Sequence, residues 1–253
     1  MVGVLAAMEG AMAISVIGTL GYTLVPSAAV VLALCVGLMM RPVGSMIHSI
    51  QACAAGVLLS GIAVEFLPQL HFARYSVSLS LFFFLGLVLM LALNRLNPGC
   101  CRSQVKSPPL LPFVAGFSIE FLVNGMVIAL SVLAGHFAVL LAAVSLAVCC
   151  FVCGLSVTTR FITVKLSFNR TVFGVMLMAL AFPVGGLLGL VFVAHLPAIW
   201  VEDAIAFGMA VMLYIATVDL LMEAFRTSRN LPKIMFFIGF ILILLMKAKV
   251  VGH

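Results

Sequence analysis

The feature that most constrains the fold of this chain is a series of apolar stretches, each long enough to cross a lipid bilayer. A transmembrane helix needs about 20 predominantly apolar residues. Eight stretches qualify, at roughly residues 15–40, 43–68, 76–96, 110–134, 137–159, 171–195, 201–225 and 231–250. The segments between them contain the proline, glycine and basic residues that are typical of helix ends. The sequence therefore predicts an all-α integral membrane protein with eight transmembrane helices.

Composition supports this prediction and argues against other classes of protein. Only 8% of the 253 residues are charged, whereas a soluble domain carries about 25%. The longest connection, residues 97–109, is about a dozen residues, so we expect one transmembrane domain over residues 1–253. The N-terminal stretch lacks a basic region and contains Glu9, which favours a lead-in to the first span over a signal peptide.

The distribution of Lys and Arg predicts the orientation of the chain. Loops on the cytoplasmic side of a membrane protein are enriched in these residues. If the N-terminus is outside, ten of the 13 basic residues are cytoplasmic: Arg41, Arg95, Arg102, Lys106, Arg160, Lys165, Arg170, Arg226, Arg229 and Lys233. Only Arg74, Lys247 and Lys249 then face outward. Both termini are therefore predicted to be outside, and the net charge of +6 needs no nucleic-acid partner to explain it.

Two short motifs in the fourth and fifth stretches share one layout. Glu120 and Asn124 are four residues apart, as are Cys149 and Cys153, and a glycine directly follows each pair. This spacing places both side chains of a pair on one face of a helix, about one turn apart. Two facing helices would then bring four donor groups together inside the bilayer. A carboxyl group there costs about 2.5–3.5 kcal/mol and usually marks a pathway or a site.

A third cysteine, Cys150, projects about 100° away from Cys149 on the same helix. Thiolates suit Cu(I), zinc and related ions, and carboxylate and amide oxygens suit harder ions. The sequence thus indicates a metal site made of Glu120, Asn124, Cys149, Cys150 and Cys153. Simpler interpretations remain open, because buried cysteine packs as a small hydrophobe and amides join helices in lipid.

The remaining acids and the absence of catalytic motifs complete this picture. Glu9, Glu202 and Asp203 are predicted to form a solvated outer rim, and Asp219 and Glu223 lie toward the inner end of the seventh stretch. The chain contains no His-Glu-x-x-His, Gly-x-Ser-Gly or P-loop motif. We therefore expect no enzymatic activity.

Several phrases resemble the ZIP (Zrt/Irt-like protein) family of metal transporters, from about Arg41 to the eighth stretch. In the second stretch these are Ala52-Cys53-Ala54-Ala55-Gly56-Val57-Leu58-Leu59 and Val64-Glu65-Phe66-Leu67-Pro68. Further matches are Gly185-Gly186 in the sixth and Ala216-Thr217-Val218-Asp219 in the seventh. The family motif His-Asn-x-Pro-Glu-Gly aligns without gaps onto residues 120–125 and again onto residues 149–154.

The motif chemistry departs from the family pattern. The family's histidine corresponds to Glu120 and Cys149, and its glutamate to Asn124 and Cys153. Both prolines are replaced by valine, and a family glutamate in the sixth span aligns with Phe182. The resemblance implies a ZIP-like bundle with both termini outside, uptake of divalent cations toward the cytoplasm, and pairing as a homodimer. It does not imply the usual binuclear zinc or iron site.

Two functions follow as hypotheses. The first is a ZIP-type metal transporter that moves a divalent or soft metal ion, such as zinc, toward the cytoplasm through a site with mixed oxygen and sulfur donors. The alternative is a ZIP-fold membrane protein that no longer transports and acts as a partner or regulator. An intramembrane enzyme or a carrier of an organic solute is a third class. The expected partners are the lipid bilayer and the metal cation, with no permanently bound cofactor.

Overall fold

The computed structural model describes residues 2–40, 45–69, 72–95, 110–134, 136–164, 167–195, 198–225 and 230–251. All of the regular elements in these ranges are helices: α1 (Val2–Met40), α2 (Ser45–Gly61), η1 (Ile62–Phe66), η2 (Leu67–Gln69), α3 (Phe72–Arg95), α4 (Leu110–Ala134), α5 (His136–Thr163), α6 (Phe168–His195), α7 (Ala198–Tyr214), η4 (Ile215–Leu221), α8 (Met222–Ala224) and α9 (Leu231–Val251). Because η1 and η2 continue α2, and η4 and α8 continue α7, the described residues form eight helical rods.

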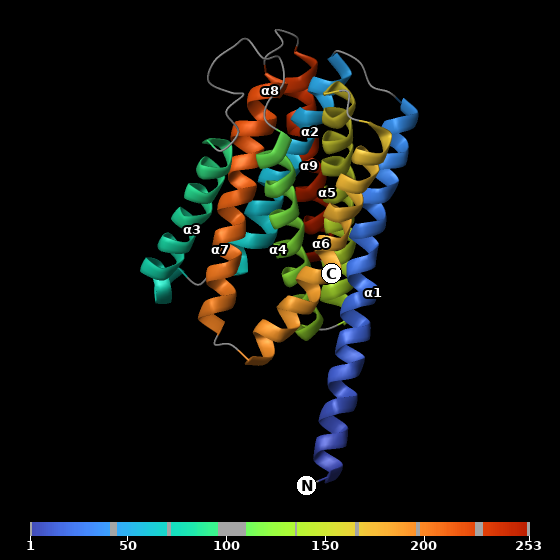
Figure 1. Ribbon diagram of the computed structural model, residues 1–253. Helices are drawn as coiled ribbons and strands as arrows, with labels where there is room; N and C mark the ends of the chain where they lie inside the picture. The colour runs from blue at the N-terminus through green and yellow to red at the C-terminus, as the bar shows by residue number, and fades with distance from the viewer. Residues whose placement is uncertain are drawn as a thin grey trace.

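The prediction of an integral multi-pass membrane protein is confirmed. Among the described residues, seven helices are long and apolar enough to cross a membrane. The eighth, α9, has a shorter apolar stretch, Leu231–Met246, within the residues whose side chains are described. The predicted boundaries agree with the helices to within a few residues, except in α1. That helix begins at Val2 instead of residue 15, and its first turns extend beyond the rest of the bundle (Figure 1).

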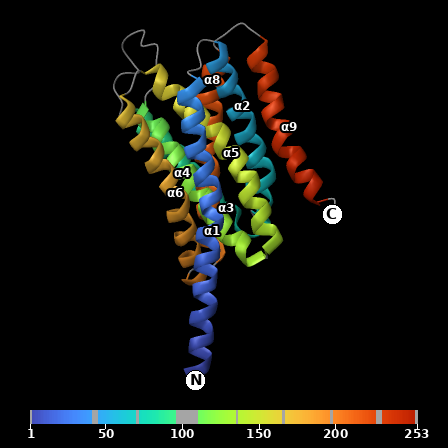
Figure 2. The same cartoon turned by 90° about the vertical axis from the view of Figure 1, so that its right-hand side faces the viewer.

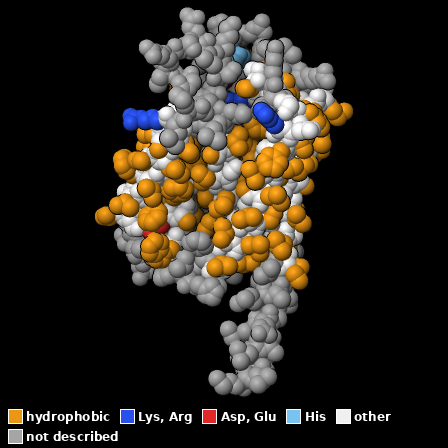
Figure 3. All heavy atoms as spheres, in the orientation of Figure 1, with side chains coloured by type: hydrophobic (Ala, Val, Ile, Leu, Met, Phe, Trp, Pro, Cys, Tyr) orange, Lys and Arg blue, Asp and Glu red, His pale blue; other side chains and the backbone are white. Residues whose placement is uncertain are grey.

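Successive rods run in opposite directions, so α1 begins and α9 ends at the same end of the bundle (Figures 1 and 2). The basic residues with described side chains lie near helix termini at the other end: Arg95, Arg160, Arg170 and Lys233. Blue Lys and Arg side chains accordingly lie near the upper limit of the orange apolar surface in Figure 3. We call this the basic end, and the opposite one the far end.

The helix contacts occur in matching pairs. Helix α1 packs on α5 in the way that α6 packs on α4, and α3 packs on α7 in the way that α9 packs on α2. In this correspondence α1 matches α6, α5 matches α4, α3 matches α9 and α7 matches α2. The two helices of each match point in opposite directions (Figure 1), which is the pattern of an inverted repeat. Both α2 and α7 are 17 residues long, and each passes directly into a π-helical segment. Such segments are rare and are frequent at functional sites.

The glycine that closes each motif lets a neighbouring helix approach closely. A Cβ atom on Gly125 would collide with the carbonyl oxygen of Phe182 in α6, and one on Gly185 would collide with that of Leu122 in α4. On α5, a Cβ on Gly154 would lie 2.9 Å from the Cβ of Ala33 in α1. The glycines of α6 thus form a surface on which α4 packs closely. Helices α4 and α5 are each held from behind, and their polar faces meet.

Candidate metal centre

Helices α4 and α5 contact each other through two faces that have the same spacing. On α4 the face consists of Phe113, Phe117, Glu120 and Asn124, and on α5 of Cys149, Cys153, Ser156 and Arg160, all of them buried. Intervals of three and four residues keep each set on one side of its helix. The helices are antiparallel, and Arg160 contacts Phe113 while Cys153 lies close to Glu120. Ser156, which lies between Cys153 and Arg160, is therefore at the level of Phe117.

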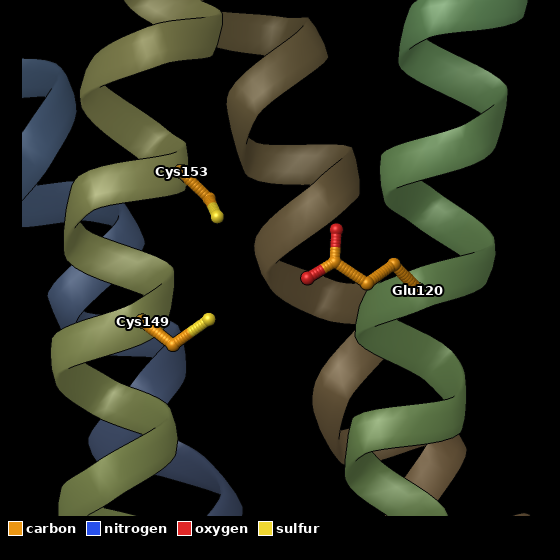
Figure 4. Close-up of side chains that lie close together, drawn as sticks. All are labelled: Glu120, Cys149 and Cys153. Carbon is orange, nitrogen blue, oxygen red and sulfur yellow. The ribbon is translucent and has the colours of Figure 1, made fainter. Parts of the chain in front are cut away.

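Three donor groups converge in this seam. A carboxylate oxygen of Glu120 and the sulfur atoms of Cys149 and Cys153 all lie within 4.8 Å of one another. Figure 4 shows the Glu120 carboxylate extending from α4 toward the two sulfurs on α5. Donor atoms bind zinc at about 2.0–2.3 Å, so small side-chain rotations suffice for all three to contact one ion. The prediction that two facing helices bring these donors together is confirmed for this trio.

Asn124 lies beside the trio, one turn from Glu120 on α4. Both residues are fully buried, and Asn124 Nδ2 lies 3.5 Å from Glu120 Oε1, the outer limit of a hydrogen bond. Glu120 Oε2 and Asn124 Oδ1 accept no hydrogen bond from the part of the chain that the structure describes. A buried polar atom left in this state costs about 1–3 kcal/mol. A bound cation would be contacted by oxygens of this kind, so Asn124 could supply a fourth donor.

Cys150 does not join the three donors. Its side chain is fully buried on α5, but its sulfur is not part of the group formed by Glu120, Cys149 and Cys153. The reason is the helical rotation of about 100° between consecutive residues, which turns Cys150 away when Cys149 faces α4. Of the five residues predicted as ligands, three converge, one contacts a member of the trio, and one lies outside.

A series of aromatic rings in contact with one another extends along α4 from the level of the centre. Phe182 of α6 is fully buried and stacks on Phe121 with 4.9 Å between ring centroids. Toward the basic end, Phe121 meets Phe117 at 6.0 Å, and Phe117 meets Phe113 at 4.8 Å. Here α6 contributes an aromatic ring and not a carboxylate. Among the described residues the three convergent donors form one group, which suits one ion.

Arg160 lies in a position that sequence reasoning missed. We expected the fifth span to end at residue 159 and Arg160 to lie in a cytoplasmic loop, but α5 continues to Thr163 and Arg160 is only 2% exposed. Its guanidinium carbon is 4.1 Å from the centroid of the Phe113 ring, a cation–π contact. It also interacts electrostatically with Asp219 in the π-helical segment η4. The available signal was the spacing of Arg160, which continues the stripe of Cys149, Cys153 and Ser156.

The predicted outer rim is also wrong at one position. Asp203 is 2% exposed and accepts a hydrogen bond of 2.6 Å from the hydroxyl of Ser78, which ties α7 to α3. Glu202 is partly exposed, as expected of a rim residue. The side chains of Glu9 and Glu65 lie outside the described residues. Asp203 is thus part of a helix contact, because position 203 faces α3 on a helix whose sequence alone shows no polar face.

Comparisons with known proteins leave the family open. No protein-family model matches this sequence, and no curated protein matches it. The arguments for a function therefore come from the bundle and the buried centre themselves.

Proposed function

We propose that this protein is a ZIP-type membrane carrier that binds a single soft or divalent transition-metal ion and moves it toward the cytoplasm. The observation that carries the proposal is the convergence of one carboxylate and two thiols, buried between α4 and α5 in the apolar part of the bundle. Ionisable groups inside a membrane are costly and mark ion pathways more often than packing contacts. At the histidine and glutamate positions of the two family motifs, this chain carries other groups able to bind a metal, whereas the family glutamate of the sixth span corresponds to Phe182.

The donor set selects the class of ion. Two sulfurs favour Cu(I), zinc and similar thiophilic ions, while a lone carboxylate would not retain magnesium or calcium against water. The metal is cargo, and its binding requires the thiols to lose their protons. Glu120 provides a charge on the opposite wall of the seam, so an ion is contacted from both helices.

The orientation of the bundle in the membrane follows from the charge distribution. The basic end is expected to face the cytoplasm, because cytoplasmic ends of membrane helices are enriched in Lys and Arg. The inverted-repeat pattern of helix contacts supports a carrier, since such repeats are common in secondary transporters and their sites lie where the repeats meet. The resemblance to ZIP transporters agrees with both arguments and adds the expected direction, toward the cytoplasm.

Elemental analysis and flux measurements test the proposal. The full-length protein, purified after growth with added zinc, copper or cobalt, should retain about one equivalent of a soft metal. Cys153→Ala and Glu120→Ala should each weaken binding by at least about 100-fold, since even outer-shell substitutions cost 10–100-fold. Cys35→Ala is the matched control, because Cys35 is an exposed free cysteine on α1. Proteoliposomes containing the variants should lose metal uptake in the same order. Equal uptake by wild type, Cys153→Ala and Glu120→Ala would refute the proposed site.

One observation favours the alternative of a ZIP-fold protein that does not transport. The stacked rings of Phe182 and Phe121 fill space beside the centre, and both are fully buried. In that case the purified protein would contain only background metal and would copurify with a second membrane protein in a stable complex. A metal-loaded protein without such a partner excludes it.

A further inference from the structure

The seam between α4 and α5 changes character on its way to the basic end. At the centre its walls carry the donors Glu120, Cys149 and Cys153. Beyond them the rings of Phe117 and Phe113 line α4, and Arg160 faces them from α5. Arg160 is seven residues beyond Cys153, about 10 Å along the helix axis. An ion that leaves the centre toward the basic end along this seam meets a fixed positive charge before it meets water.

One ring contact and one nearby opposite charge act on Arg160. The guanidinium lies over the face of Phe113 at 4.1 Å, where the ring's electron density attracts a cation. Asp219 supplies the compensating negative charge from η4, on a different helix. The Asp219 atom Oδ2 is buried and accepts no hydrogen bond from a described residue, so this carboxylate has an acceptor position open toward a donor. Arg160 therefore has two supports, an aromatic one on α4 and an acidic one on η4.

We infer that Arg160 is the gate residue between the metal centre and the basic end, with Phe113 as its closed support and Asp219 as its counter-ion. While Arg160 lies over Phe113, its charge repels a metal cation and its side chain occupies the seam. The passage opens when the guanidinium leaves Phe113 and moves toward the Asp219 carboxylate. This carboxylate lies in the π-helical segment that follows α7, and such segments are frequent at functional sites. The inference rests on the proposed function for its purpose, but it can be tested without any metal.

Accessibility of Cys153 reports on the gate. Vesicles with the full-length protein in known orientation are treated with membrane-impermeant methanethiosulfonate reagents, one cationic and one anionic, from either side. Mass spectrometry then measures the rate of modification at Cys153. In Arg160→Ala the cationic reagent added at the basic end should react at least about tenfold faster than in wild type, the effect of a barrier lowered by about 1.4 kcal/mol. The rate of modification by the anionic reagent should increase less.

Two comparisons separate a gate from general loosening of the fold. Arg160→Lys keeps the positive charge. The rate at which the cationic reagent modifies Cys153 from the basic end should therefore stay within about threefold of the wild-type rate, a small change on the energy scale of the barrier. Reaction from the far end should be unchanged in every variant. Asp219→Asn removes the counter-charge while Arg160 remains, so the cationic reagent should react more slowly from the basic end.

The outcomes are distinct from those of the metal experiments. An unchanged cationic rate in Arg160→Ala, or an equal increase from both ends, overturns the gate. If Arg160→Ala does not fold, Asp219→Asn decides, because an unchanged or increased cationic rate in that variant contradicts the inference. If the modification rates change as expected but the protein binds no metal, the gate is supported and the proposed metal cargo is refuted. If the protein binds metal but the modification rates do not change, the metal centre is supported and the gate is refuted.

Discussion

Replacement of Gly125 by alanine tests whether the close approach of α4 and α6 holds the metal centre together. The added Cβ would collide with the carbonyl oxygen of Phe182 and would lie 2.8 Å from the backbone nitrogen of Gly186, where ordinary contacts begin at 3.4 Å. Both obstacles are backbone atoms, so no side-chain rotation relieves them. Helix α6 must move away from α4 along this contact.

The expected change in stability combines two opposing effects. Overpacking a close contact costs about 1–3 kcal/mol, and loss of adjacent packing between Gly185 and Leu122 places this site at the upper part of that range. Alanine is intrinsically better in a helix than glycine by about 1 kcal/mol. The net expectation is a destabilisation of about 1–2 kcal/mol. Displacement of Phe182 should also disturb its stacking on Phe121, next to Glu120, and weaken metal binding.

Gly21→Ala is the matched control for this substitution. A Cβ on Gly21 meets no atom within 4 Å, and the residue is exposed on α1. The same gain in helix propensity therefore applies without a collision, and this variant should be as stable as wild type or slightly more so. Thermal unfolding of both variants in detergent, followed by circular dichroism, measures the difference. If Gly125→Ala unfolds at the same temperature as Gly21→Ala, the argument from close helix packing is wrong.

Three further predictions follow from the buried polar contacts. Metal retention should fall as the pH is lowered, because protons compete for the Cys149 and Cys153 thiolates; equilibrium dialysis between pH 8 and pH 5 measures this, and constant retention would argue against thiolate ligands. Ser27→Ala should destabilise the bundle by about 0.6–1.7 kcal/mol. Its hydroxyl lies 2.9 Å from the carbonyl oxygens of both Thr23 and Ala179, and the Ala179 oxygen lacks its helical partner because Pro183 has no N–H. Ser78→Ala should destabilise the α3–α7 contact by about 1–3 kcal/mol, since it leaves the buried Asp203 carboxylate without its donor. Thermal unfolding compares both serine variants with wild type and with Gly21→Ala, whose added Cβ meets no atom within 4 Å.

Much of the architecture was predictable from one sequence because the bilayer restricts the possibilities. In lipid, every backbone polar group must be satisfied within the segment, so long apolar stretches become helices and their boundaries follow from composition. The predicted limits of α4, 110–134, agree with the observed Leu110–Ala134. The spacing of Glu120, Asn124, Cys149 and Cys153 likewise determined which side chains share a helix face, whatever the helices contact.

The tertiary structure decided which faces meet, and a uniformly apolar sequence carries little information about that. Apart from the helical spacing by which Arg160 continues the buried stripe of α5, nothing in the nearby sequence distinguishes a cytoplasmic cation from one buried over Phe113. Its burial depends on α4 and η4 lying beside the end of α5. Asp203 was misassigned for the same reason, because its environment is created by Ser78 on a distant helix. Local sequence determines helices through the cost of unpaired backbone groups in lipid, whereas the positions of charges inside the bundle depend on contacts between helices far apart in the chain.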